Sequence, residues 1–583
     1  MEKKRDNREI ARTFDEIGDM LEILGENVFK INAYRRAADN IRSLGRDLSV
    51  MAQEGSLGSI EGVGKAIAGK IEELVATGRL EYYDRLAEKV PEGLLDMLDV
   101  PDLGPRRVRA IWEHLGIGDL DALEEAAKRN SLRELEGFGA KTEAKILSGI
   151  ESLRARKISG RTPIAVAWET ALEILEVLRS VSKTRAEAGG SLRRRRETVG
   201  DLDFLCATEK PSGEIMDRFC SMKKVETVML RGETKASVRL ETGLQADLRV
   251  VDASRWGTAL QYFTGNQQHN VRLRERARKR GLSLSEYALK RISSDEEILC
   301  AEEEDVYRNL ELPWIPPEMR EDRGEIEAAL EGTLPEPLVL EDIAGDLQCH
   351  SDESDGTAPL EEMAKAAGKL GRKWLLLTDH SSGLGVARGL SPERIRNQGR
   401  RIDEWNDSGK GIRVLKGIEA EIMADGSLDL PEDILAELDV VVAAVHSSLR
   451  QDREKITKRY LKALANPFVH ILAHPTGRLI GERDGTSPDW EAVLAEAVKT
   501  GTILELNANP YRLDLPEGLA ARACELGAFF AISTDAHSTE QLGYMHFGLS
   551  LARRAWIPPE RIVNTWDVEK LLDWVKRKAS RVK

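Results

Sequence analysis

The C-terminal part of the chain alternates short apolar segments with stretches of helical periodicity. The six clearest apolar segments are 373-KWLLLTD, 413-RVLKGIEAEI, 438-LDVVVAAVHSS, 468-FVHILAHP, 502-TILELNANP and 529-FFAISTDAH. Strands that alternate with helices pair in parallel, because each helix carries the chain back to the starting edge of the sheet. From residue 346 onward we therefore expect a (β/α) barrel.

Histidines and carboxylates collect at the ends of these segments. Five of the nine histidines stand there with three carboxylates: His350, His380, His446, His474, His537, Asp355, Glu419 and Asp535. A lone histidine is usually structural, but the C-terminal ends of barrel strands meet at one rim, which is where barrel active sites form. Mixed imidazole and carboxylate ligands suit manganese, zinc or iron, which can activate water for phosphoester hydrolysis. The pattern predicts a metal site.

A repeated glycine turn marks the first 160 residues. Its three copies are 60-IEGVGKAIAGKIEEL, 101-PDLGPRRVRAIWEHLG and 135-LEGFGAKTEAKILSGI. In each, a tight turn leads into an amphipathic helix, so we expect an all-α region. The exposed N–H groups and the helix dipole favour a phosphate oxygen, and this helix-hairpin-helix pattern grips DNA backbone without reading sequence. The turn glycines expected at DNA are Gly62, Gly64, Gly104, Gly137 and Gly139. The alternative is that some copies only pack helices.

The segment 189-GGSLRRRRETVGDLDFLCAT predicts a second metal site. It follows a helix at 165–180 and begins a mixed α/β region with further strands near 225, 236 and 245. Asp201 and Asp203 lie two apart on a predicted strand, so their side chains face the same way. Asp247 in 245-QADLRVVD offers a third carboxylate. Carboxylates and substrate phosphates suit Mg²⁺, and two such ions can activate a 3′-hydroxyl and stabilise leaving pyrophosphate. The alternative without a metal site is an acidic strand end beside a basic loop.

Bulk properties restrict the class of protein. The 583 residues predict several domains, and the net charge of −14 argues against general attraction to nucleic acid. A local basic surface is still present, because 272-RLRERARKR holds six basic residues. The five cysteines are scattered, the N-terminus lacks a signal-peptide core and no apolar run is long enough to span a membrane. We expect a cytoplasmic protein.

The motifs GGSLRR, GDLD, ADLR and 262-YFTGNQQHNVRLR together resemble the family X DNA polymerases over residues 1–310. By this likeness Asp201, Asp203 and Asp247 are the Mg²⁺-binding catalytic carboxylates. The implied nucleotide-binding residues are Gly190, Ser191, Arg194, Gly200, Arg249, Tyr262, Phe263, Gly265, Asn270 and Arg274. Among them, Ser191 and Arg194 would hold the outer phosphates, and Tyr262, Phe263 and Gly265 would discriminate against ribose. Asn266 stands where many members have serine, with little consequence expected.

The same resemblance implies a lysine nucleophile in the first domain, which in this family often excises a sugar phosphate through a Schiff base. Lys70 in 62-GVGKAIAGKI matches that nucleophile, and Lys30 and Tyr34 match its phosphate-binding helpers. Ala66 replaces a basic residue of the family pattern. The alternative is that Lys70 merely contacts DNA.

The C-terminal ligand set resembles the PHP phosphoesterase domain, and a family X core followed by this domain is similar to the bacterial and archaeal PolX arrangement. The resemblance implies Mn²⁺ or Zn²⁺, more than one ion, and 3′→5′ exonuclease activity. The family usually has His-x-His where this chain has Gln348-Cys349-His350. Since a glutamine offers a metal only a neutral amide oxygen, we expect one ion to bind weakly or to be absent. A barrel kept for structure or for DNA positioning is the alternative.

The expected protein is therefore multidomain: an all-α helix-hairpin-helix N-terminal region, an α+β nucleotidyltransferase palm with a fingers- and thumb-like subdomain, and a C-terminal PHP barrel of (β/α)₇ type. The expected divisions are a lyase-like domain at 1–85, a second helical DNA-binding region at 86–160, the palm at 161–252, the base-pair subdomain at 253–315, a linker at 316–340 and the PHP domain at 341–583. We expect a monomeric repair polymerase that acts on gapped or primer–template DNA with dNTPs, away from membranes. Its rivals are an untemplated terminal transferase, a DNA-end scaffold with decayed sites, and a polymerase fused to a small-molecule phosphatase.

Overall fold

The computed structural model describes residues 7–42, 44, 48–60, 62–98, 100, 103–135, 137–139, 142, 143, 145–147, 150, 161–181, 185–209, 211–383, 387–449, 451–578 and 581. The chain divides into two compact units: the first contains residues 1–160 with the segments 351–357 and 380–391, and the second contains the rest of residues 161–583. Within the described residues, no helix has both the length and the apolar character that crossing a bilayer requires.

The N-terminal unit is all-α, as the glycine-turn repeats predict. Its described helices are α1 (Asn7–Ile23), α2 (Val28–Arg42), α3 (Leu48–Gln53), η1 (Leu57–Ser59), α4 (Lys65–Thr77), α5 (Glu81–Ala87), α6 (Glu92–Leu98), α7 (Pro105–Leu115), α8 (Leu120–Lys128) and η2 (Ser131–Glu134). Their apolar faces share one core, from Ile10 in α1 to Ile150. The apolar residues that recur with helical periodicity in the sequence are thus the ones buried in this core.

The turn glycines have the backbone conformations that the repeat requires. Gly62 and Gly137 have positive φ, at 73° and 82°. Gly64 and Gly104 are the N-cap residues of α4 and α7. A Cβ at Gly62 would also lie 2.9 Å from Cδ of Arg36, so this turn excludes other residues for two reasons. Much of the third repeat's helix, including Ala140 and Lys141, lies outside the described residues.

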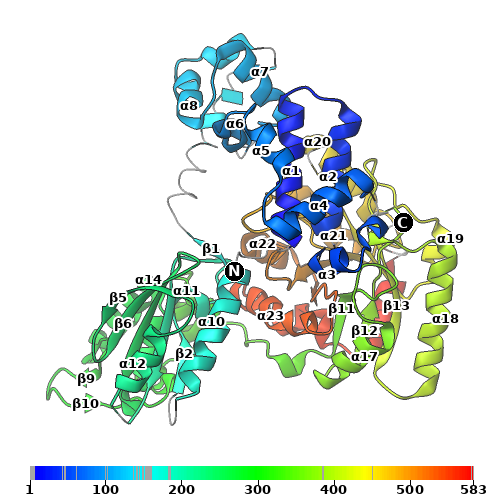
Figure 1. The fold of residues 1–583 in the computed structure, drawn as a ribbon. Coiled ribbons are helices and arrows are strands. Elements are labelled where there is room, and N and C mark those ends of the chain that lie inside the picture. Colours follow the sequence, from blue (N-terminus) through cyan, green and yellow to red (C-terminus); the bar gives the residue numbers. More distant parts are fainter. Residues whose placement is uncertain are drawn as a thin grey trace. The chain divides into compact units, whose positions relative to one another are not determined.

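The palm is a five-stranded mixed sheet in the order β2-β4-β7-β6-β5 (Figure 1). Its elements are α10 (Ile164–Arg179), β2 (Arg185–Ala188), α11 (Gly190–Arg193), β4 (Leu202–Ala207), α12 (Gly213–Cys220), β5 (Val225–Arg231), β6 (Lys235–Leu240) and β7 (Gln245–Val251), with β1 (Thr162–Pro163) paired to β3 (Thr198–Val199) beside it. Phe204 and Cys206 share a core with residues of α10 and α12, whereas Leu205 and Ala207 pack on Trp256. The alternation gives the sheet two faces that are covered differently.

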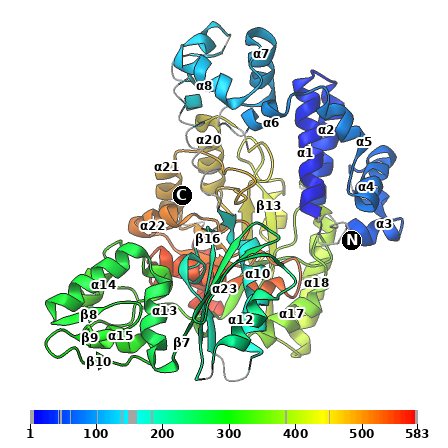
Figure 2. The ribbon, with the colours of Figure 1, turned by 60° about the vertical axis from the view of Figure 1, so that its left-hand side comes forward.

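A second subdomain follows the palm (Figure 2). Its elements are η3 (Ala253–Arg255), α13 (Trp256–Thr264), α14 (Gln267–Lys279), β8 (Leu282–Leu284), β9 (Leu289–Arg291), β10 (Glu297–Ile298) and α15 (Glu303–Asn309). Leu273, Leu289 and Tyr307 lie in its separate core.

Residues 316–340, where we expected a linker, contain η4 (Pro317–Met319) and α16 (Glu325–Glu331). Arg320 is fully buried and pairs with Glu303 at 2.5 Å. Glu325 is likewise buried and lies 2.6 Å from Nδ1 of His269. The polar residues that suggested a linker therefore neutralise buried groups of the preceding subdomain.

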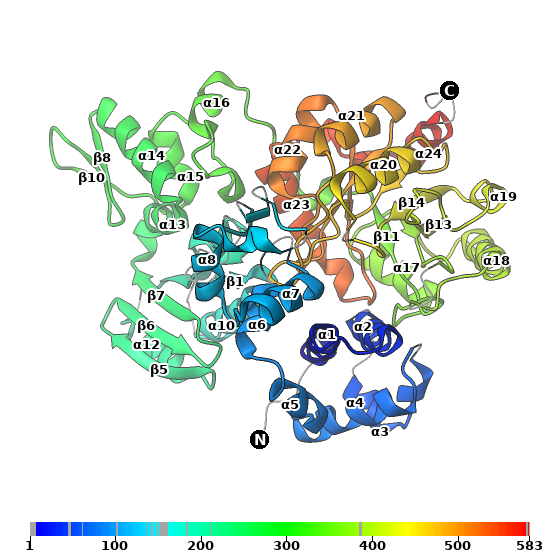
Figure 3. The same ribbon diagram turned by 90° about the horizontal axis from the view of Figure 1, so that it is seen from above.

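The C-terminal region is a seven-stranded parallel sheet in sequence order, β11 to β17, with helices around the strands (Figure 3). The strands are β11 (Gly345–Cys349), β12 (Trp374–Leu377), β13 (Arg413–Glu421), β14 (Val440–Ala444), β15 (Ile471–Leu472), β16 (Ile503–Asn507) and β17 (Phe530–Ser533). The helices are η5 (Leu340–Asp342), α17 (Leu360–Lys369), α18 (Pro392–Ser408), α19 (Glu432–Leu435), α20 (Arg453–Leu464), α21 (Trp490–Thr500), α22 (Glu517–Leu526), η7 (Gln541–Tyr544), α23 (Met545–Arg554), η8 (Pro559–Arg561), η9 (Val563–Thr565) and α24 (Val568–Lys576).

The first and last strands nearly close this sheet into the expected barrel. The backbone N–H of His350 donates to the carbonyl of Ala536 at 2.8 Å, and that of Asp535 donates to the carbonyl of Gln348 at 3.0 Å. The six apolar segments became β12 to β17. The seventh strand, β11, was not among them, because Asp346 and Gln348 interrupt its apolar run.

Candidate active sites

Asp203 and Asp247 lie on the sheet face that α10 and α12 leave open, whereas Asp201, predicted on the same strand as Asp203, lies just before the start of β4. Because Phe204 and Cys206 point toward those helices, Asp203 points the other way. Strands β4 and β7 are parallel and in register, with Asp203 directly opposite Asp247. Gln245 donates an amide hydrogen bond to Asp247 at 3.1 Å and so holds its carboxylate. The structure brings these two predicted ligands together.

The pKa of Asp203 is raised by its buried position and by the neighbouring carboxylates. Burial raises this pKa, and the charges of Asp201 and Asp247 raise it further, so that it reaches about 7 despite Arg194 and Arg249. Carboxylates gathered in this way repel one another, and a hard cation bound between them relieves the repulsion. The three side chains therefore fit Mg²⁺.

The Gly-Gly turn lies against Asp203. The N–H of Gly189 donates to the carbonyl of Asp203 at 2.8 Å. Gly190 has a φ of +56°, and a Cβ there would lie 2.4 Å from Oδ2 of Asp203. A side chain at position 190 would both strain the backbone and displace the carboxylate.

The four arginines that follow this turn have protein partners. Arg193 forms a bidentate ion pair with Glu303 at 2.8 and 2.9 Å. Arg194 donates to Glu321 at 3.0 Å and to the carbonyl of Thr264. For Arg194 to hold a phosphate, as the resemblance implies, the phosphate would have to replace Glu321.

Several residues predicted to bind the nucleotide lie around the junction of α13 and α14. The rings of Tyr262 and Phe263 meet edge to face at 5.3 Å, and Arg249 lies 5.3 Å over Phe263. Asn270 donates to the carbonyl of Tyr262 at 2.8 Å, and Arg274 donates to the carbonyl of Asn270 at 3.3 Å.

Gly265 and Gly200 are the other glycines predicted at the nucleotide. Gly265 has a φ of +68° just after α13, which permits the turn into α14. A Cβ at Gly200 would meet only Arg161, at 3.5 Å. Ser191 lies in α11, next to Gly190.

The predicted barrel ligands converge at the C-terminal ends of the strands. Glu419 of β13 is the central carboxylate, and its oxygens lie 2.9 Å from Nε2 of His474, 3.2 Å from Nε2 of His446 and 3.5 Å from Nε2 of His350. Three sets of ligand atoms lie close enough to hold an ion: His350, Asp355, His380 and His537; His380, Glu419 and His446; and His350, Glu419 and Asp535.

Glu421 orients one of these ligands. Its carboxylate lies 2.8 Å from Nδ1 of His446, which directs Nε2 toward Glu419. Burial alone would lower the pKa of His446, but Glu419 and Glu421 outweigh it and raise that pKa to about 10. Second carboxylates of this kind fix the tautomer of metal-binding histidines.

Gln348 occupies the position where the family usually has a histidine. It is fully buried, and its Nε2 donates to Asp535 at 3.5 Å. Among the described residues its Oε1 has no hydrogen-bond partner. This oxygen is available as a neutral ligand, which is weaker than an imidazole nitrogen for zinc or manganese.

The donor set of the barrel fits a metal centre. Oε1 of Glu505 and Nδ1 of His474 are also buried, and neither has a hydrogen-bond partner within the described part of the chain. Buried polar atoms are costly to leave unsatisfied, and the unpartnered oxygen of Glu505 feels the like charges of Asp535 and Glu419, which favours a bound cation. The mixture of nitrogen and oxygen donors suits Mn²⁺ or Zn²⁺.

In the N-terminal unit the three predicted lyase-domain residues also meet. Nζ of Lys70 lies 4.9 Å over the ring of Tyr82 and 6.0 Å over that of Tyr34. Tyr34 and Tyr82 stack at 5.8 Å, and Lys30 lies 5.8 Å over Tyr82. Burial, with Tyr82 beside it, raises the pKa of Tyr34. Tyr82 was not predicted.

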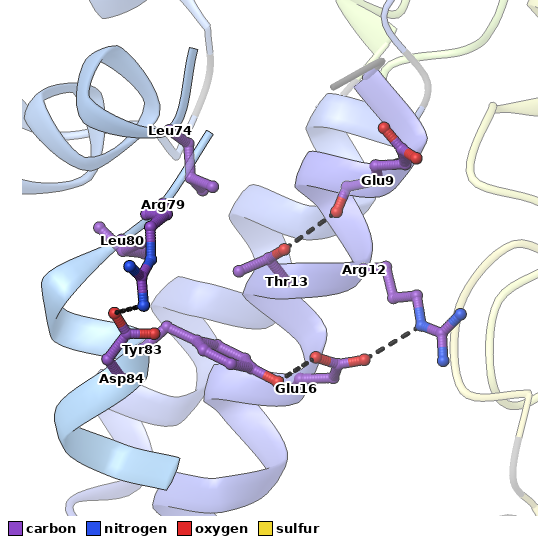
Figure 4. A pocket seen from close by; sticks show the side chains of 9 residues that line it. All are labelled: Glu9, Arg12, Thr13, Glu16, Leu74, Arg79, Leu80, Tyr83 and Asp84. Carbon is purple, nitrogen blue, oxygen red and sulfur yellow. Dashed lines mark hydrogen bonds and ion pairs between the residues drawn. The ribbon is translucent and has the colours of Figure 1, made fainter. Parts of the chain in front are cut away.

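A cavity of about 480 Å³ in the same unit is a separate feature (Figure 4). Its lining residues are Glu9, Arg12, Thr13, Glu16, Leu74, Arg79, Leu80, Tyr83 and Asp84. Glu16 accepts hydrogen bonds from Tyr83 at 2.7 Å and Arg12 at 3.0 Å. Because Lys70 is not in its lining, this cavity is not the candidate lyase site.

Comparison with known proteins identifies four regions. Residues 5–80 match a helix-hairpin-helix domain, 94–152 a SAM-like helix-hairpin-helix tandem, 259–321 the DNA polymerase beta thumb and 346–509 the PHP domain. The chain is 38% identical over 573 residues to the DNA polymerase/3′-5′ exonuclease PolX of Bacillus subtilis (strain 168), covering 98% of this chain and 99% of that protein. The chain belongs to the PolX family.

The barrel has relatives outside PolX. A probable phosphatase of Thermoanaerobacter sp. (strain X514) is 30% identical over 241 residues, which cover 38% of this PolX chain and 90% of the phosphatase. A probable phosphatase of Acetivibrio thermocellus is 30% identical over 232 residues, covering 38% of the chain and 91% of that protein.

The family assignment confirms the expected polymerase and PHP architecture. Polar residues that sequence reasoning missed complete both sites of this PolX chain. In the palm these are Gln245 and Glu321, and in the barrel Glu421, Glu505, Asn507 and Arg512. The pairs Glu419–Glu421 and Glu505–Asn507 repeat the two-residue spacing that identified Asp201 and Asp203, and that signal could have revealed them.

Proposed function

We propose that the protein is a DNA-directed DNA polymerase that also trims DNA in the 3′→5′ direction. The observation that carries the polymerase is Asp203 opposite Asp247 on an open sheet face, against a turn that only glycine can form. The PolX of B. subtilis is named for both activities.

In the palm, Asp201, Asp203 and Asp247 would hold Mg²⁺. Bound there, the ions would supply activation of the primer 3′-hydroxyl and neutralisation of phosphate charge. Gln245 holds Asp247 in place, and Gly190 leaves room for the carboxylate of Asp203. Tyr262, Phe263 and Gly265 would border the sugar, so that a 2′-hydroxyl meets backbone at a tight turn.

In the barrel, the candidate ligands are Gln348, His350, Asp355, His380, Glu419, His446, His474, Asp535 and His537. Mn²⁺ or Zn²⁺ held by them would supply charge stabilisation at the scissile phosphate. Glu421 keeps Nδ1 of His446 occupied, and Arg512, at 3.6 Å from Asp535, adds a positive charge at the same rim.

The substrate class follows from these sites together with the N-terminal motifs. We propose that gapped or primer–template DNA lies on the turns at Gly62, Gly64, Gly104, Gly137 and Gly139, with dNTPs entering the palm. The physiological role would be gap filling in base excision repair, by a monomer in the cytoplasm.

A lyase function is supported by the cluster of Lys70, Tyr34, Lys30 and Tyr82. The ammonium groups of Lys30 and Lys70 both lie within about 6 Å of the Tyr82 ring, and their positive charges would attract a 5′-phosphate. Lys70 would then attack the sugar as a neutral amine. Borohydride trapping on DNA with a 5′-deoxyribose phosphate should label the wild type and not Lys70→Ala.

One experiment tests the two main activities together. A 5′-labelled gapped DNA is incubated with Mg²⁺ or Mn²⁺, with and without dNTPs. We expect Asp201→Ala to abolish extension and to spare trimming, and His380→Ala to do the reverse. Loss of both activities from either change would contradict separate sites. Equal extension of a primer without template would instead indicate a terminal transferase.

The phosphatase relatives favour one second candidate for the barrel, a phosphatase for small phosphate esters. Release of inorganic phosphate from a sugar phosphate, without shortening of labelled DNA, would establish it. The absence of both reactions at saturating Mn²⁺ would leave the barrel with a structural or DNA-positioning role.

A further inference from the structure

An ion pair joins the palm to the rim of the barrel. Glu197 lies between α11 and β3, just after the four arginines, and Arg478 lies in the loop that follows His474. The two guanidinium nitrogens Nη1 and Nη2 of Arg478 reach the two carboxylate oxygens of Glu197 at 3.2 and 2.6 Å. Both side chains are partly shielded, with 15% and 33% exposed, so solvent screens this bidentate pair only in part.

The same guanidinium ties two loops of the barrel together. Its Nε donates to the carbonyl of Arg512 at 2.8 Å, and Nη2 also donates to the carbonyl of Leu513. Asp514 completes the connection, because it accepts hydrogen bonds from the N–H of Thr476 at 3.1 Å and of Gly477 at 2.9 Å. The loop after β15 and the loop after β16 are thus held as one piece.

Both loops carry groups of the metal site. His474 begins the first, and its Nε2 lies 2.9 Å from Glu419. Arg512 lies in the second, and its Nε is 3.6 Å from Asp535. A shift of Arg478 would therefore move a candidate ligand and a positive charge at the same time.

On the palm side, the segment that carries Glu197 is fixed by the barrel as well. Arg554 of α23 donates to the carbonyl of Arg194 at 3.0 Å and to the carbonyl of Arg195. The guanidinium of Arg195 lies 3.6 Å over Trp168 of α10 and 5.5 Å over Phe547 of α23. This segment begins at the turn that packs on Asp203. We call residues 190–197 the nucleotide loop; it contacts the palm at one end and the barrel at the other.

We infer that Glu197 and Arg478 are a positioning pair, which holds the nucleotide loop of the palm and the two ligand-bearing loops of the barrel in one mutual arrangement. The inference rests on the proposed polymerase and exonuclease functions. The pair touches no reacting group. It acts through the turn at Gly190–Arg194 on one side and through His474 and Arg512 on the other. Lysine cannot replace Arg478, because one ammonium group cannot reach both carboxylate oxygens and two carbonyls.

The decisive variant is Glu197→Gln, a change in the palm whose effect is measured in the barrel. We expect about tenfold weaker Mn²⁺ binding in calorimetry and about tenfold slower trimming of single-stranded DNA without dNTPs. Hydrogen exchange at the amides of Thr476 and Gly477 should accelerate, with no metal present. In extension assays the KM for dNTP should rise while kcat changes little. Glu173→Gln is the matched control, because Glu173 pairs with Lys224 within the palm at 2.5 Å.

A double-mutant cycle with Arg478→Lys completes the test. If the pair acts as a unit, the double variant will be no worse than the worse single variant in Mn²⁺ affinity. Additive losses, or Mn²⁺ affinity and amide exchange in Glu197→Gln equal to those of Glu173→Gln, would overturn the inference. Failure of the proposed function is distinguishable, because the wild type would then neither extend nor trim DNA.

Discussion

Asp203 combines a raised pKa with a neighbour that has no side chain. Its carboxylate is crowded by Asp201 and Asp247, and a Cβ at Gly190 would lie 2.4 Å from Oδ2. The absence of a side chain at Gly190 therefore leaves room for the carboxylate of a candidate ligand, in addition to allowing the turn. Sequence reasoning found both residues, because spacing along a strand and a Gly-Gly pair are local signals.

Gly190→Ala should disable the palm selectively. Its Cβ would lie 2.4 Å from Oδ2 of Asp203, at a φ of +56°. A displacement of about 1 Å at a reacting centre costs on the order of 100-fold in rate. Single-turnover extension should fall by about that factor, with trimming unchanged. Gly213→Ala, where a new Cβ meets no atom within 4 Å, is the control. Equal extension by the two variants would contradict the argument.

Glu421→Gln should weaken the barrel site without removing a ligand. The amide cannot hold Nδ1 of His446 as a carboxylate does, so the ring loses its fixed orientation. Partners of this type are worth about 10–100-fold in metal affinity. Isothermal titration with Mn²⁺ would measure the loss, with Glu437→Gln, an exposed partner of Arg396, as the control. Unchanged affinity would show that Glu421 only supports the loop.

At the scale of elements, apolar periodicity predicted most strands and helices, but it missed the elements whose sequences are interrupted by polar residues. Strands β12 to β17 follow from their apolar runs, whereas β11 carries Asp346, which accepts hydrogen bonds from Thr534. Residues 316–340 have the composition of a linker, yet Arg320 is buried against Glu303. In both cases a buried polar residue is paired with a residue elsewhere in the chain. Composition shows that the residue is polar, but it does not show which residue pairs with it.

The end of α24 offers a test of burial at this scale. Lys578 is buried, and burial lowers the pKa of its ammonium group to about 7. A lysine in the unfolded chain has a pKa of about 10.4. Between pH 7 and that value, the unfolded state therefore binds a proton that the folded state lacks. The free energy of unfolding should therefore rise as pH increases from 7 toward about 10.

Denaturant unfolding at pH 7, 8 and 9, followed by tryptophan fluorescence, would measure this dependence. We expect Lys578→Met to flatten the rise, and Lys576→Met, on the exposed last residue of α24 two positions earlier, to retain it. A wild-type stability that falls over this range would mean that Lys578 stays charged when buried.

At the scale of the whole molecule, the features that the sequence could not reveal are those that join domains. The contact between Glu197 and Arg478 spans 281 residues, and that between Arg194 and Arg554 spans 360. Within the arginine run, the family resemblance implied phosphate binding for Arg194, and arginine suits phosphates. Its neighbours in the fold are carboxylates, carbonyls and rings of other domains, and they determine what those charges do.

Metal binding should affect the thermal unfolding of the two compact units differently. The N-terminal helices belong to one compact unit, which also includes the segments of Asp355 and His380, whereas most candidate ligands, among them Glu419, His446 and Asp535, lie in the other. A ligand stabilises only the unit that binds it, by about 2.7 kcal/mol at 100 times its dissociation constant. Calorimetric scans with increasing Mn²⁺ should therefore raise one transition and leave the other unchanged. Glu419→Gln should abolish most of that rise, whereas Asp201→Ala should keep it, because Glu419 belongs to two of the barrel ligand sets and Asp201 to none of them. A rise of both transitions together would mean that the two units unfold as one and that the N-terminal helices are coupled to the barrel.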